Sequence, residues 1–255
     1  MRLENVVKQK LRNGEVVMGV FNPMPSPDVV EILALAGFDF ILLDAEHGRI
    51  SPDDAYPMIL AAEARDVPIF VRVGENDRQV ILKYLDLGVS GVMIPQTSTP
   101  ELVAEAVAAM RYAPEGVRGL AGGRTFDYGV GRPMPELIGA INERVLTIAQ
   151  FEHIDALPHV NAMLATPGLD VLFVGPSDLG QSMGYGGQYG IPEVEAVIQQ
   201  VIEAAKGTGV ALAIVAPDIA TVNKRIAQGF QMIVPNAPGL LMKASRDLLA
   251  AVERS

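Results

Sequence analysis

Eight short apolar runs of β-type residues recur along the chain, and longer amphipathic stretches separate them. The runs occupy residues 16–21, 39–44, 68–73, 91–95, 145–151, 170–175, 210–215 and 231–235. Several runs are continuously apolar rather than alternating, which is typical of strands that are covered on both faces. Strands that alternate with helix-length segments indicate right-handed crossovers and a parallel sheet.

Four of the intervening stretches carry clear helix signals. Ser-Pro pairs open residues 26–37 and 51–64, where Ser can cap the helix and Pro fits its first turn. Residues 99–112 and 192–207 place apolar side chains at helical spacing. Eight strand–helix units of this length predict an α/β fold, a (β/α)8 TIM barrel, with residues 1–255 as one domain. The alternative is a doubly wound open sheet. That fold usually has a Gly-rich turn after its first strand, where this chain has FNPMPSP.

Composition excludes several classes of function. The net charge is −10, Trp is absent and no Lys or Arg run occurs, which argues against a nucleic-acid partner. Without any Cys the chain has no disulfide, thiolate metal site or cysteine nucleophile. No export signal is present, and no apolar run approaches the ~20 residues that cross a bilayer. We therefore expect a soluble, cytoplasmic protein with no membrane partner.

Charged and polar residues gather after four of the eight runs. In a TIM barrel the chemistry is carried by the carboxyl ends of the strands. Residues at the ends of the second, third, fifth and sixth runs are Asp44, Glu46, His47, Arg72, Gln150, Glu152, His153, Gly175, Pro176, Ser177 and Asp178. A closed barrel would bring these two adjacent pairs of strands over one opening.

His47 and Arg72 each allow two interpretations. His47 can be an ordinary loop histidine, or an acid/base whose tautomer and basicity are set by nearby Asp44. Arg72 is a cation inside an apolar run and needs a partner. That partner can be Asp44 or Glu46 in a structural ion pair, or the carboxylate of an anionic substrate. No role is assigned to Glu46.

Glu152 and Asp178 also allow two interpretations. Both can be helix caps, or they can hold a hard divalent cation such as Mg²⁺ or Mn²⁺ through their oxygens. No lysine follows a predicted strand, so a Schiff-base lysine is not expected and the metal should act as the Lewis acid. The six lysines are Lys8, Lys10, Lys83, Lys206, Lys224 and Lys243.

Five segments together resemble one enzyme family. They are LLDAEHG, FVRV, GVMIPQTSTPELVAEAVAAMRYAPEGVRG, AQFE and FVGPSDLGQSMGYGG, in that order. Over nearly the whole chain they are similar to the metal-dependent (class II) pyruvate aldolases of the 4-hydroxy-2-oxoheptanedioate and 2-dehydro-3-deoxyglucarate type. The resemblance implies a carbon–carbon lyase on a (β/α)8 barrel. Its substrate would be a 4-hydroxy-2-oxo acid, cleaved reversibly to pyruvate, or a close 2-oxo acid such as hydroxypyruvate, and an aldehyde.

The resemblance also assigns residues. Glu152 and Asp178 match the ligands of the divalent metal, which would be Mg²⁺, Mn²⁺ or Co²⁺. Arg72 matches the arginine that binds the carboxylate or carbonyl region of pyruvate, and Gln150 matches a substrate contact. His47 and Asp44 match a pair that acts with a bound water as acid and base.

Assembly and selectivity follow from the same resemblance. It implies a homohexamer, a trimer of dimers, with the final helix exchanged between neighbours and Asp86 reaching a neighbouring subunit's site. Val215 begins the small, apolar segment VAP, which lies where relatives set aldehyde selectivity. The turn Gly175-Pro176-Ser177 can offer backbone N–H groups to the substrate carboxylate, except at Pro176.

One departure and three alternatives stay open. After GVRG the family often has a Ser/Ala-Arg-rich stretch, whereas this chain has LAGGRTFDYGVGRP, which leaves the role of Arg124 open. The whole irregular region 111–135 reads as a mobile or interface-forming loop. The alternatives are a lyase acting on a coenzyme A thioester, a 2-oxo-acid decarboxylase at the same site, and a catalytically silent 2-oxo-acid binder.

Overall fold

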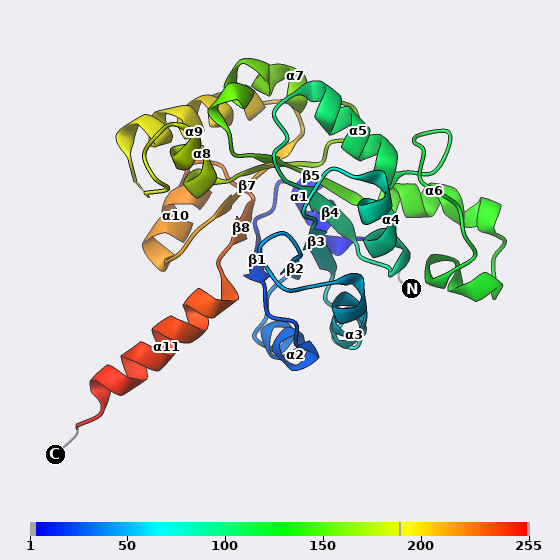
Figure 1. The fold of residues 1–255 in the computed structure, drawn as a ribbon, viewed down its shortest axis with the longest axis horizontal. Coiled ribbons are helices and arrows are strands. Elements are labelled where there is room, and N and C mark those ends of the chain that lie inside the picture. The colour runs from blue at the N-terminus through cyan, green and yellow to red at the C-terminus, as the bar shows by residue number, and fades with distance from the viewer. Residues whose placement is uncertain (1–3, 189, 254–255) are drawn as a thin grey trace.

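The eight strands close into a parallel barrel in chain order (Figure 1). The structure, a computed structural model, describes residues 4–188 and 190–253. The strands are β1 (Val17–Asn22), β2 (Phe40–Asp44), β3 (Ile69–Arg72), β4 (Gly91–Ile94), β5 (Leu146–Phe151), β6 (Val171–Val174), β7 (Ala211–Val215) and β8 (Met232–Val234). The (β/α)8 prediction is confirmed, and the open-sheet alternative is wrong because β8 pairs with β1.

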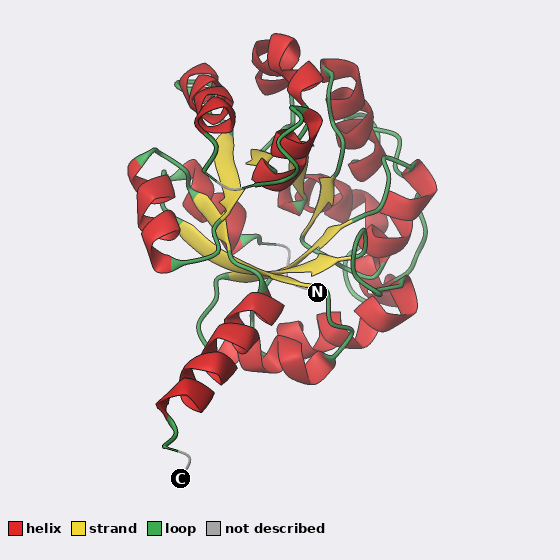
Figure 2. Ribbon diagram, turned by 60° about the vertical axis from the view of Figure 1, so that its left-hand side comes forward, coloured by secondary structure: helices red, strands yellow, loops and turns green. Residues whose placement is uncertain are grey.

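Helices surround this barrel on its outside (Figure 2). They are α1 (Val6–Arg12), α2 (Pro27–Leu35), α3 (Pro52–Glu63), α4 (Arg78–Asp86), α5 (Pro100–Met110), α6 (Met134–Arg144), α7 (Val160–Leu164), α8 (Pro176–Ser182), α9 (Pro192–Ala205), α10 (Ile219–Ala227) and α11 (Ala237–Ala251), with the 3-10 helices η1 (Arg124–Gly129) and η2 (Ile154–His159). Across the described ranges, no helix is long and apolar enough to cross a bilayer.

Helix starts follow the predicted cap chemistry. Ser26 accepts the N–H of Val29 at the start of α2, and Thr99 accepts that of Leu102 at the start of α5. Ser51 and Asp54 form a reciprocal capping box at the start of α3. Each cap satisfies N–H groups that have no partner within the helix, so the sequence fixes where these helices begin.

Aromatic side chains fill the inside of the barrel. The rings of Phe40 and Phe70 pack with their centroids 5.1 Å apart. Gly19 leaves room for this packing, because a Cβ there would lie 2.0 Å from the Phe40 ring. The interior is thus a packed core and not a pore, and ligands must bind at one of its ends. We call the end at the carboxyl termini of the strands the mouth and the opposite end the foot.

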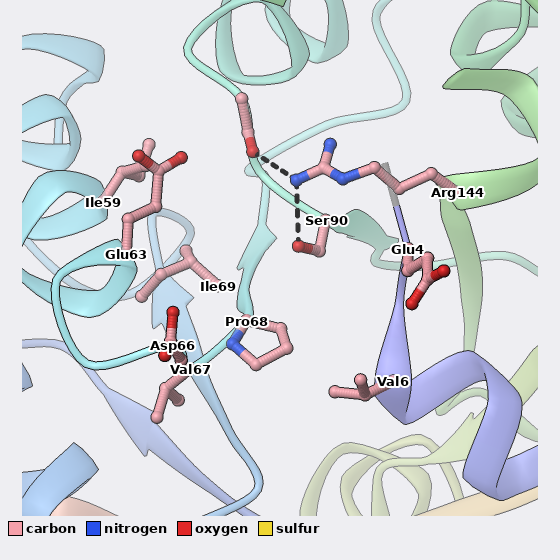
Figure 3. A pocket seen from close by; sticks show the side chains of 11 residues that line it. Glu4, Val6, Ile59, Glu63, Asp66, Val67, Pro68, Ile69, Ser90 and Arg144 are labelled. Carbon is pink, nitrogen blue, oxygen red and sulfur yellow. Dashed lines mark hydrogen bonds between the residues drawn. The ribbon is translucent and has the colours of Figure 1, made fainter. Parts of the chain in front are cut away.

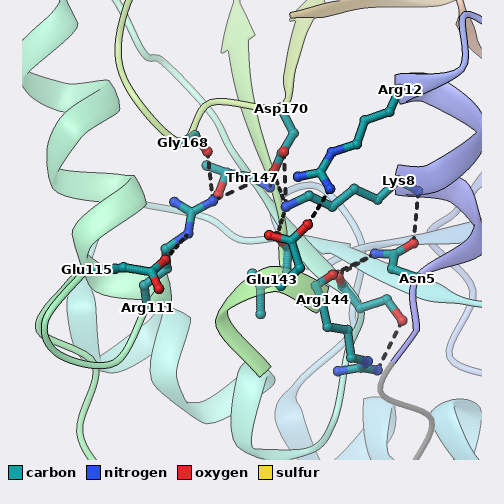
Figure 4. A network of polar contacts seen from close by, with 12 residues as sticks. Asn5, Lys8, Arg12, Arg111, Glu115, Glu143, Arg144, Thr147, Gly168 and Asp170 are labelled. Carbon is teal, nitrogen blue, oxygen red and sulfur yellow. Dashed lines mark hydrogen bonds and ion pairs between the residues drawn. The ribbon is translucent and has the colours of Figure 1, made fainter. Parts of the chain in front are cut away.

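Helix α1 covers the foot through a buried polar network (Figure 4). Lys8 Nζ donates to Val145 O at 2.9 Å and lies 3.0 Å from Asp170 Oδ1. Burial lowers the pKa of Lys8, an effect that the charge of Asp170 opposes. Asn5 Nδ2 donates to the carbonyl oxygens of Ser90 and Arg144. These contacts fasten the start of the chain to the strand starts.

The region 111–135 contains more order than its composition indicates. It includes η1, and Phe126 of η1 is fully buried beside Tyr112. Leu137 and Ile141 of α6 complete this small apolar cluster. The region is therefore attached to the barrel through a core of its own.

Helix α11 runs away from the barrel (Figures 1 and 2). Its contacts with the body of the molecule include β1. Several large apolar side chains of α11 are exposed: Leu240, Leu241, Met242, Leu248 and Leu249.

Candidate active site

Asp44 and Arg72 form a buried ion pair at the mouth. They are register partners at the ends of β2 and β3. Arg72 Nε donates to Asp44 Oδ1 at 3.0 Å and Nη2 donates to Oδ2 at 2.7 Å, and the two residues are 8% and 6% exposed. The ring centroid of Phe21 lies 4.8 Å from the Arg72 Cζ atom. Such a bidentate pair holds the guanidinium in one orientation. The structural ion pair allowed by the sequence is thus formed.

The turn after β2 is tight. Asp44 Oδ1 accepts the backbone N–H groups of Glu46 and His47, each at 3.2 Å. A Cβ on Gly48 would lie 2.1 Å from Asp44 O, so the turn requires glycine at this position. The Asp-x-Glu-His-Gly spacing therefore has a structural cause in addition to any chemical one.

The His47 ring faces outward at the mouth. Its side chain is 67% exposed, and Nε2 lies 3.8 Å from Glu46 Oε2. Asp44 holds the backbone of His47, whereas the imidazole faces the carboxylate of Glu46. Glu46 Oε2 also lies 3.2 Å from Arg72 Nη1. Glu46, which had no role assigned from the sequence, thus connects Arg72 with His47.

Glu152 and Gln150 lie together at the end of β5. Gln150 Nε2 donates to Glu152 Oε2, and Gln96 N donates to Glu152 Oε1 at 2.6 Å. Gln150 Oε1 is buried and has no hydrogen-bond partner among the described residues. A Cβ on Gly175 would lie 3.0 Å from Glu152 Cβ and 3.1 Å from Gln150 Nε2. Gly175 therefore leaves the space that both side chains occupy.

Negative charge is concentrated at this point. The pKa of Glu152 is raised to about 7, first by burial and then by the carboxylates of Asp178 and Glu46, against the Gln96 N–H bond and Arg72. Burial also raises the pKa of Glu46, and the charges of Asp44 and Asp178 act in the same direction. Side chains from the ends of β2, β3, β5 and β6 therefore share one electrostatic environment, which a bound cation would relieve.

Neither acidic ligand candidate is a helix cap. The residue before α8 is Gly175, with no side-chain cap, and His153 Nδ1 caps η2 by accepting from Asp155 N. His153 therefore has a structural role. Asp178 lies in the first turn of α8 and is exposed.

The donor set fits a hard cation. Within residues 4–188 and 190–253, no three His, Asp or Glu side chains form a ready-made metal cage. Two carboxylates alone leave coordination positions for substrate and solvent, an arrangement suited to Mg²⁺ or Mn²⁺.

The other residues expected at the mouth differ in how freely they can contact a ligand. Gly175 N donates to Phe151 O at 2.9 Å, so its N–H group is already used. Pro176 is buried and Ser177 is half-buried at the start of α8. Val215 is half-buried at the end of β7, opposite Val234 of β8.

Asp86 and Arg124, which the family resemblance brought into question, lie at the foot of the barrel. Asp86 ends α4 and accepts from Arg118 Nη2 at 2.8 Å. Arg124 bonds to Glu63 and donates from Nε to Leu87 O at 3.0 Å. Neither reaches the mouth of its own barrel, because helix ends at the foot are a whole strand length away.

The lysines occupy α1, α4, α10, α11 and the end of α9. Lys8 is buried with a lowered pKa, a property of lysines that form Schiff bases, but it lies at the foot beside Asp170. The buried lysine and the mouth carboxylates are thus at opposite ends of the barrel.

A cavity of about 690 Å³ also lies at the foot (Figure 3). Val6, Pro68 and Ile69 give it apolar walls, and the Arg144 guanidinium closes one side. That guanidinium donates to Gly88 O, among other acceptors, and burial lowers its pKa to about 10. Its hydrogen bonds fasten the turn after α4, so we assign the chemistry to the mouth.

Sequence reasoning missed three residues of the mouth. They are Phe21 beside Arg72, and Gln96 and Thr97 next to the end of β5. Gln96 acts through its backbone and Phe21 through the face of its ring. Neither contribution leaves a charged or metal-binding residue type for sequence reasoning to find.

Comparison with known proteins identifies the family. Residues 17–237 match the HpcH/HpaI aldolase/citrate lyase family. The chain is 34% identical over 243 residues to the hydroxypyruvate/pyruvate aldolase of Sagittula stellata, covering 95% of each chain. It is 33% identical over 247 residues to the 5-keto-4-deoxy-D-glucarate aldolase of Salmonella paratyphi C, covering 96% and 95%.

A solved structure agrees with these relatives. The crystal structure of an HpcH/HpaI aldolase/citrate lyase family protein from Burkholderia cenocepacia J2315 superposes with a TM-score of 0.91. It is 33% identical in sequence, with 96% of this chain and 98% of that one covered. The aldolase resemblance of the sequence motifs is confirmed. The chain belongs to the HpcH/HpaI aldolase/citrate lyase family and is an enzyme of the carbon–carbon lyase class.

Proposed function

We propose that this enzyme cleaves a 4-hydroxy-2-oxo acid reversibly to pyruvate, or hydroxypyruvate, and an aldehyde, with a divalent metal. The observation that carries the proposal is the crowding of the Glu152, Asp178 and Glu46 carboxylates beside the buried cation of Arg72. The names of the two aldolase relatives support this substrate class.

Glu152 and Asp178 would hold the metal. When bound, Mg²⁺, Mn²⁺ or Co²⁺ supplies a Lewis acid that polarises the 2-keto group and stabilises the enolate left by cleavage. Placing two acidic groups there is costly without a cation, as the raised pKa of Glu152 indicates.

Arg72 and Gln150 bind the 2-oxo acid. Arg72, held by Asp44 in one orientation, places positive charge where the enolate oxygen develops. The Oε1 atom of Gln150 is buried and has no hydrogen-bond partner within the described part of the chain, so it is free to contact the substrate. Ser177 supplies a backbone N–H group at the start of α8 for the substrate carboxylate.

His47 removes the proton of the 4-hydroxyl group. Its exposed ring at the mouth can reach a substrate, and Glu46, 3.8 Å from Nε2, stabilises the imidazolium that forms. Val215, at the end of β7, borders the space that the aldehyde occupies.

The same proposal includes assembly into a hexamer built from dimers. In that assembly α11 packs on a second copy, and Asp86 lies near a neighbour's mouth. The exposed leucines of α11 support the exchange, because a lone amphipathic helix gains stability only when its apolar face is buried.

Metal removal tests the function. Chelator-treated protein should not cleave 4-hydroxy-2-oxo acids, and added Mg²⁺, Mn²⁺ or Co²⁺ should restore cleavage. The loaded enzyme should also exchange the methyl hydrogens of pyruvate in deuterated water, which distinguishes it from a silent binder. Full activity of the chelated protein would contradict the metal role.

Borohydride provides a second test. Reduction in the presence of pyruvate should leave the mass of the protein unchanged, because no lysine is assigned to the chemistry. A stable adduct on any lysine would instead indicate Schiff-base catalysis.

A further inference from the structure

Gln96, just after β4, has an unusual backbone conformation. Its φ of 52° lies in the left-handed region, which residues other than glycine adopt at a cost in energy. Gln96 N donates to Glu152 Oε1 at 2.6 Å, and Thr97 N donates to Gln150 O at 3.3 Å. In an extended strand, consecutive N–H groups point to opposite sides. The left-handed residue thus directs two successive donors towards β5.

The Thr97 hydroxyl closes the same turn. It is buried, donates to Ile94 O at 2.9 Å and accepts from Gln150 N at 3.0 Å. Because β4 ends at Ile94, no backbone carbonyl of β4 lies opposite the N–H of Gln150, and the Thr97 hydroxyl accepts its hydrogen bond instead. Without it, the buried N–H of Gln150 would lose its acceptor, which is costly.

These contacts converge on one carboxylate. The turn fixes the backbone of Gln150 on both sides, and Gln150 Nε2 donates to Glu152 Oε2. Gln96 N holds the other oxygen, Oε1. Each oxygen of Glu152 thus accepts one hydrogen bond and keeps a lone pair in a defined direction. Outer groups that orient a ligand in this way strengthen metal binding.

We propose that Gln96 and Thr97 are positioning residues, and that their turn sets the orientation in which Glu152 receives a divalent cation. The inference rests on the metal site of the proposed function. Asp178, the other expected ligand, lies exposed at the start of α8, so the fixed side of the site is the β5 side. Thr97 therefore affects the affinity for the metal although it does not touch the metal itself.

Mn²⁺ binding to the chelator-treated full chain, measured by titration calorimetry and by the electron paramagnetic resonance of free Mn²⁺, tests the proposal without activity. Thr97→Val should bind about tenfold more weakly than wild type, and Thr97→Ser should recover most of that loss. The matched control is Thr147→Val, a buried residue of β5 at the foot end of the strand, whose hydroxyl has no hydrogen-bond partner among the described residues. It should bind like wild type.

A second pair of variants acts through the backbone. Gln96→Gly keeps the N–H group and favours the left-handed conformation, whereas Gln96→Val keeps the N–H group and disfavours that conformation. Gln96→Gly should bind Mn²⁺ about tenfold more tightly than Gln96→Val. This comparison carries the test if Thr97→Val does not fold, as judged by circular dichroism and thermal melting.

Two negative results are distinguishable. If wild type binds Mn²⁺ and both Thr97→Val and Gln96→Val bind it as tightly as wild type, the positioning role is overturned while the proposed function stands. If wild type binds none of Mn²⁺, Mg²⁺ or Co²⁺, the proposed function fails and the inference fails with it.

Discussion

Arg72 is oriented before any substrate binds. Asp44 holds it with two hydrogen bonds, and the ring of Phe21 lies against the guanidinium. A lysine ammonium is a point charge that cannot make the bidentate pair. At the scale of single residues, the mouth therefore depends on geometry as well as on charge.

Arg72→Lys tests this dependence. We expect kcat/KM for cleavage to fall by about 100-fold or more, the usual effect of losing an oriented charge at a developing oxyanion. Steady-state kinetics with saturating Mg²⁺ measure the change, and circular dichroism checks the fold. Activity close to wild type would show that charge alone is sufficient.

Metal affinity should depend on pH through Glu152. Its pKa of about 7 means that the proton competes with the cation below that pH. The apparent Mn²⁺ affinity should weaken by about tenfold per pH unit on acidification and level off above the pKa. Calorimetric titrations across this window measure it, and a flat profile would contradict the assignment of Glu152.

The folding stability of the metal-free protein should depend on pH in the opposite direction to the metal affinity. A carboxyl whose pKa is raised by folding favours the folded state while it is protonated. Its contribution is lost as the pH rises from the unfolded value of 4.5 to about 7. Denaturant unfolding of metal-free protein should therefore show falling stability over that range, which bound Mn²⁺ removes.

Gly175→Ala tests the space beside Glu152. The new Cβ would lie 3.0 Å from Glu152 Cβ, so Glu152 must give way by a few tenths of an ångström. We expect weaker Mn²⁺ binding and lower kcat/KM in a folded protein. Gly139→Ala is the control, because a Cβ at this position of α6 meets nothing within 4 Å. Alanine is also a better helix former than glycine. Equal metal binding by both variants would show that the mouth adapts freely.

At the scale of elements, all eight strands were predictable because each is a short apolar run bounded by turn residues. The mouth was predictable where charged residues follow apolar strands, as at Asp44, Arg72 and Glu152. The partners of those residues were only partly predictable. Sequence reasoning allowed Asp44 to pair with the His47 ring or with Arg72, and in the structure Asp44 accepts hydrogen bonds from Arg72 and from the His47 backbone. Choosing between such partners requires side-chain directions that spacing alone does not contain.

Helix α11 is the element that the proposed assembly would bury against a second copy. Leu241 and Leu248 are exposed on it, so Leu241→Glu with Leu248→Glu should disrupt packing between copies. Light scattering coupled to size exclusion should show a smaller particle than wild type. The control Lys243→Glu changes the charge of the same helix at an exposed ion pair and should leave the assembly intact. A wild-type particle of one chain would contradict the exchange.

At the scale of the whole molecule, stability and chemistry lie at opposite ends of the barrel. The foot contains Lys8, Asp170 and Arg144 in its polar network, whereas the mouth contains Glu152 and the carboxylates that raise its pKa. Lys8→Ala would remove the cation that lies 3.0 Å from Asp170 and leave Arg111 Nη2 at 3.8 Å from it. We expect a loss of about 3 kcal/mol in the free energy of unfolding, as for breaking a buried pair.

Urea denaturation measures that loss, and kcat should stay close to wild type because Lys8 is remote from the mouth. Lys10→Ala removes a more exposed pair with Asp39 and should cost less than about 1 kcal/mol. Equal effects of the two variants would show that burial at the foot adds nothing.

The placement of Val215 has a consequence for protein engineering. It borders the mouth at the end of β7 and packs beside Val234, a barrel length from the polar network that fastens α1. If Val215 borders the aldehyde as proposed, directed evolution can randomise this position to admit bulkier or more polar aldehydes without lowering the thermal stability of the barrel. The range of accepted aldehydes and the thermal stability could then be optimised separately.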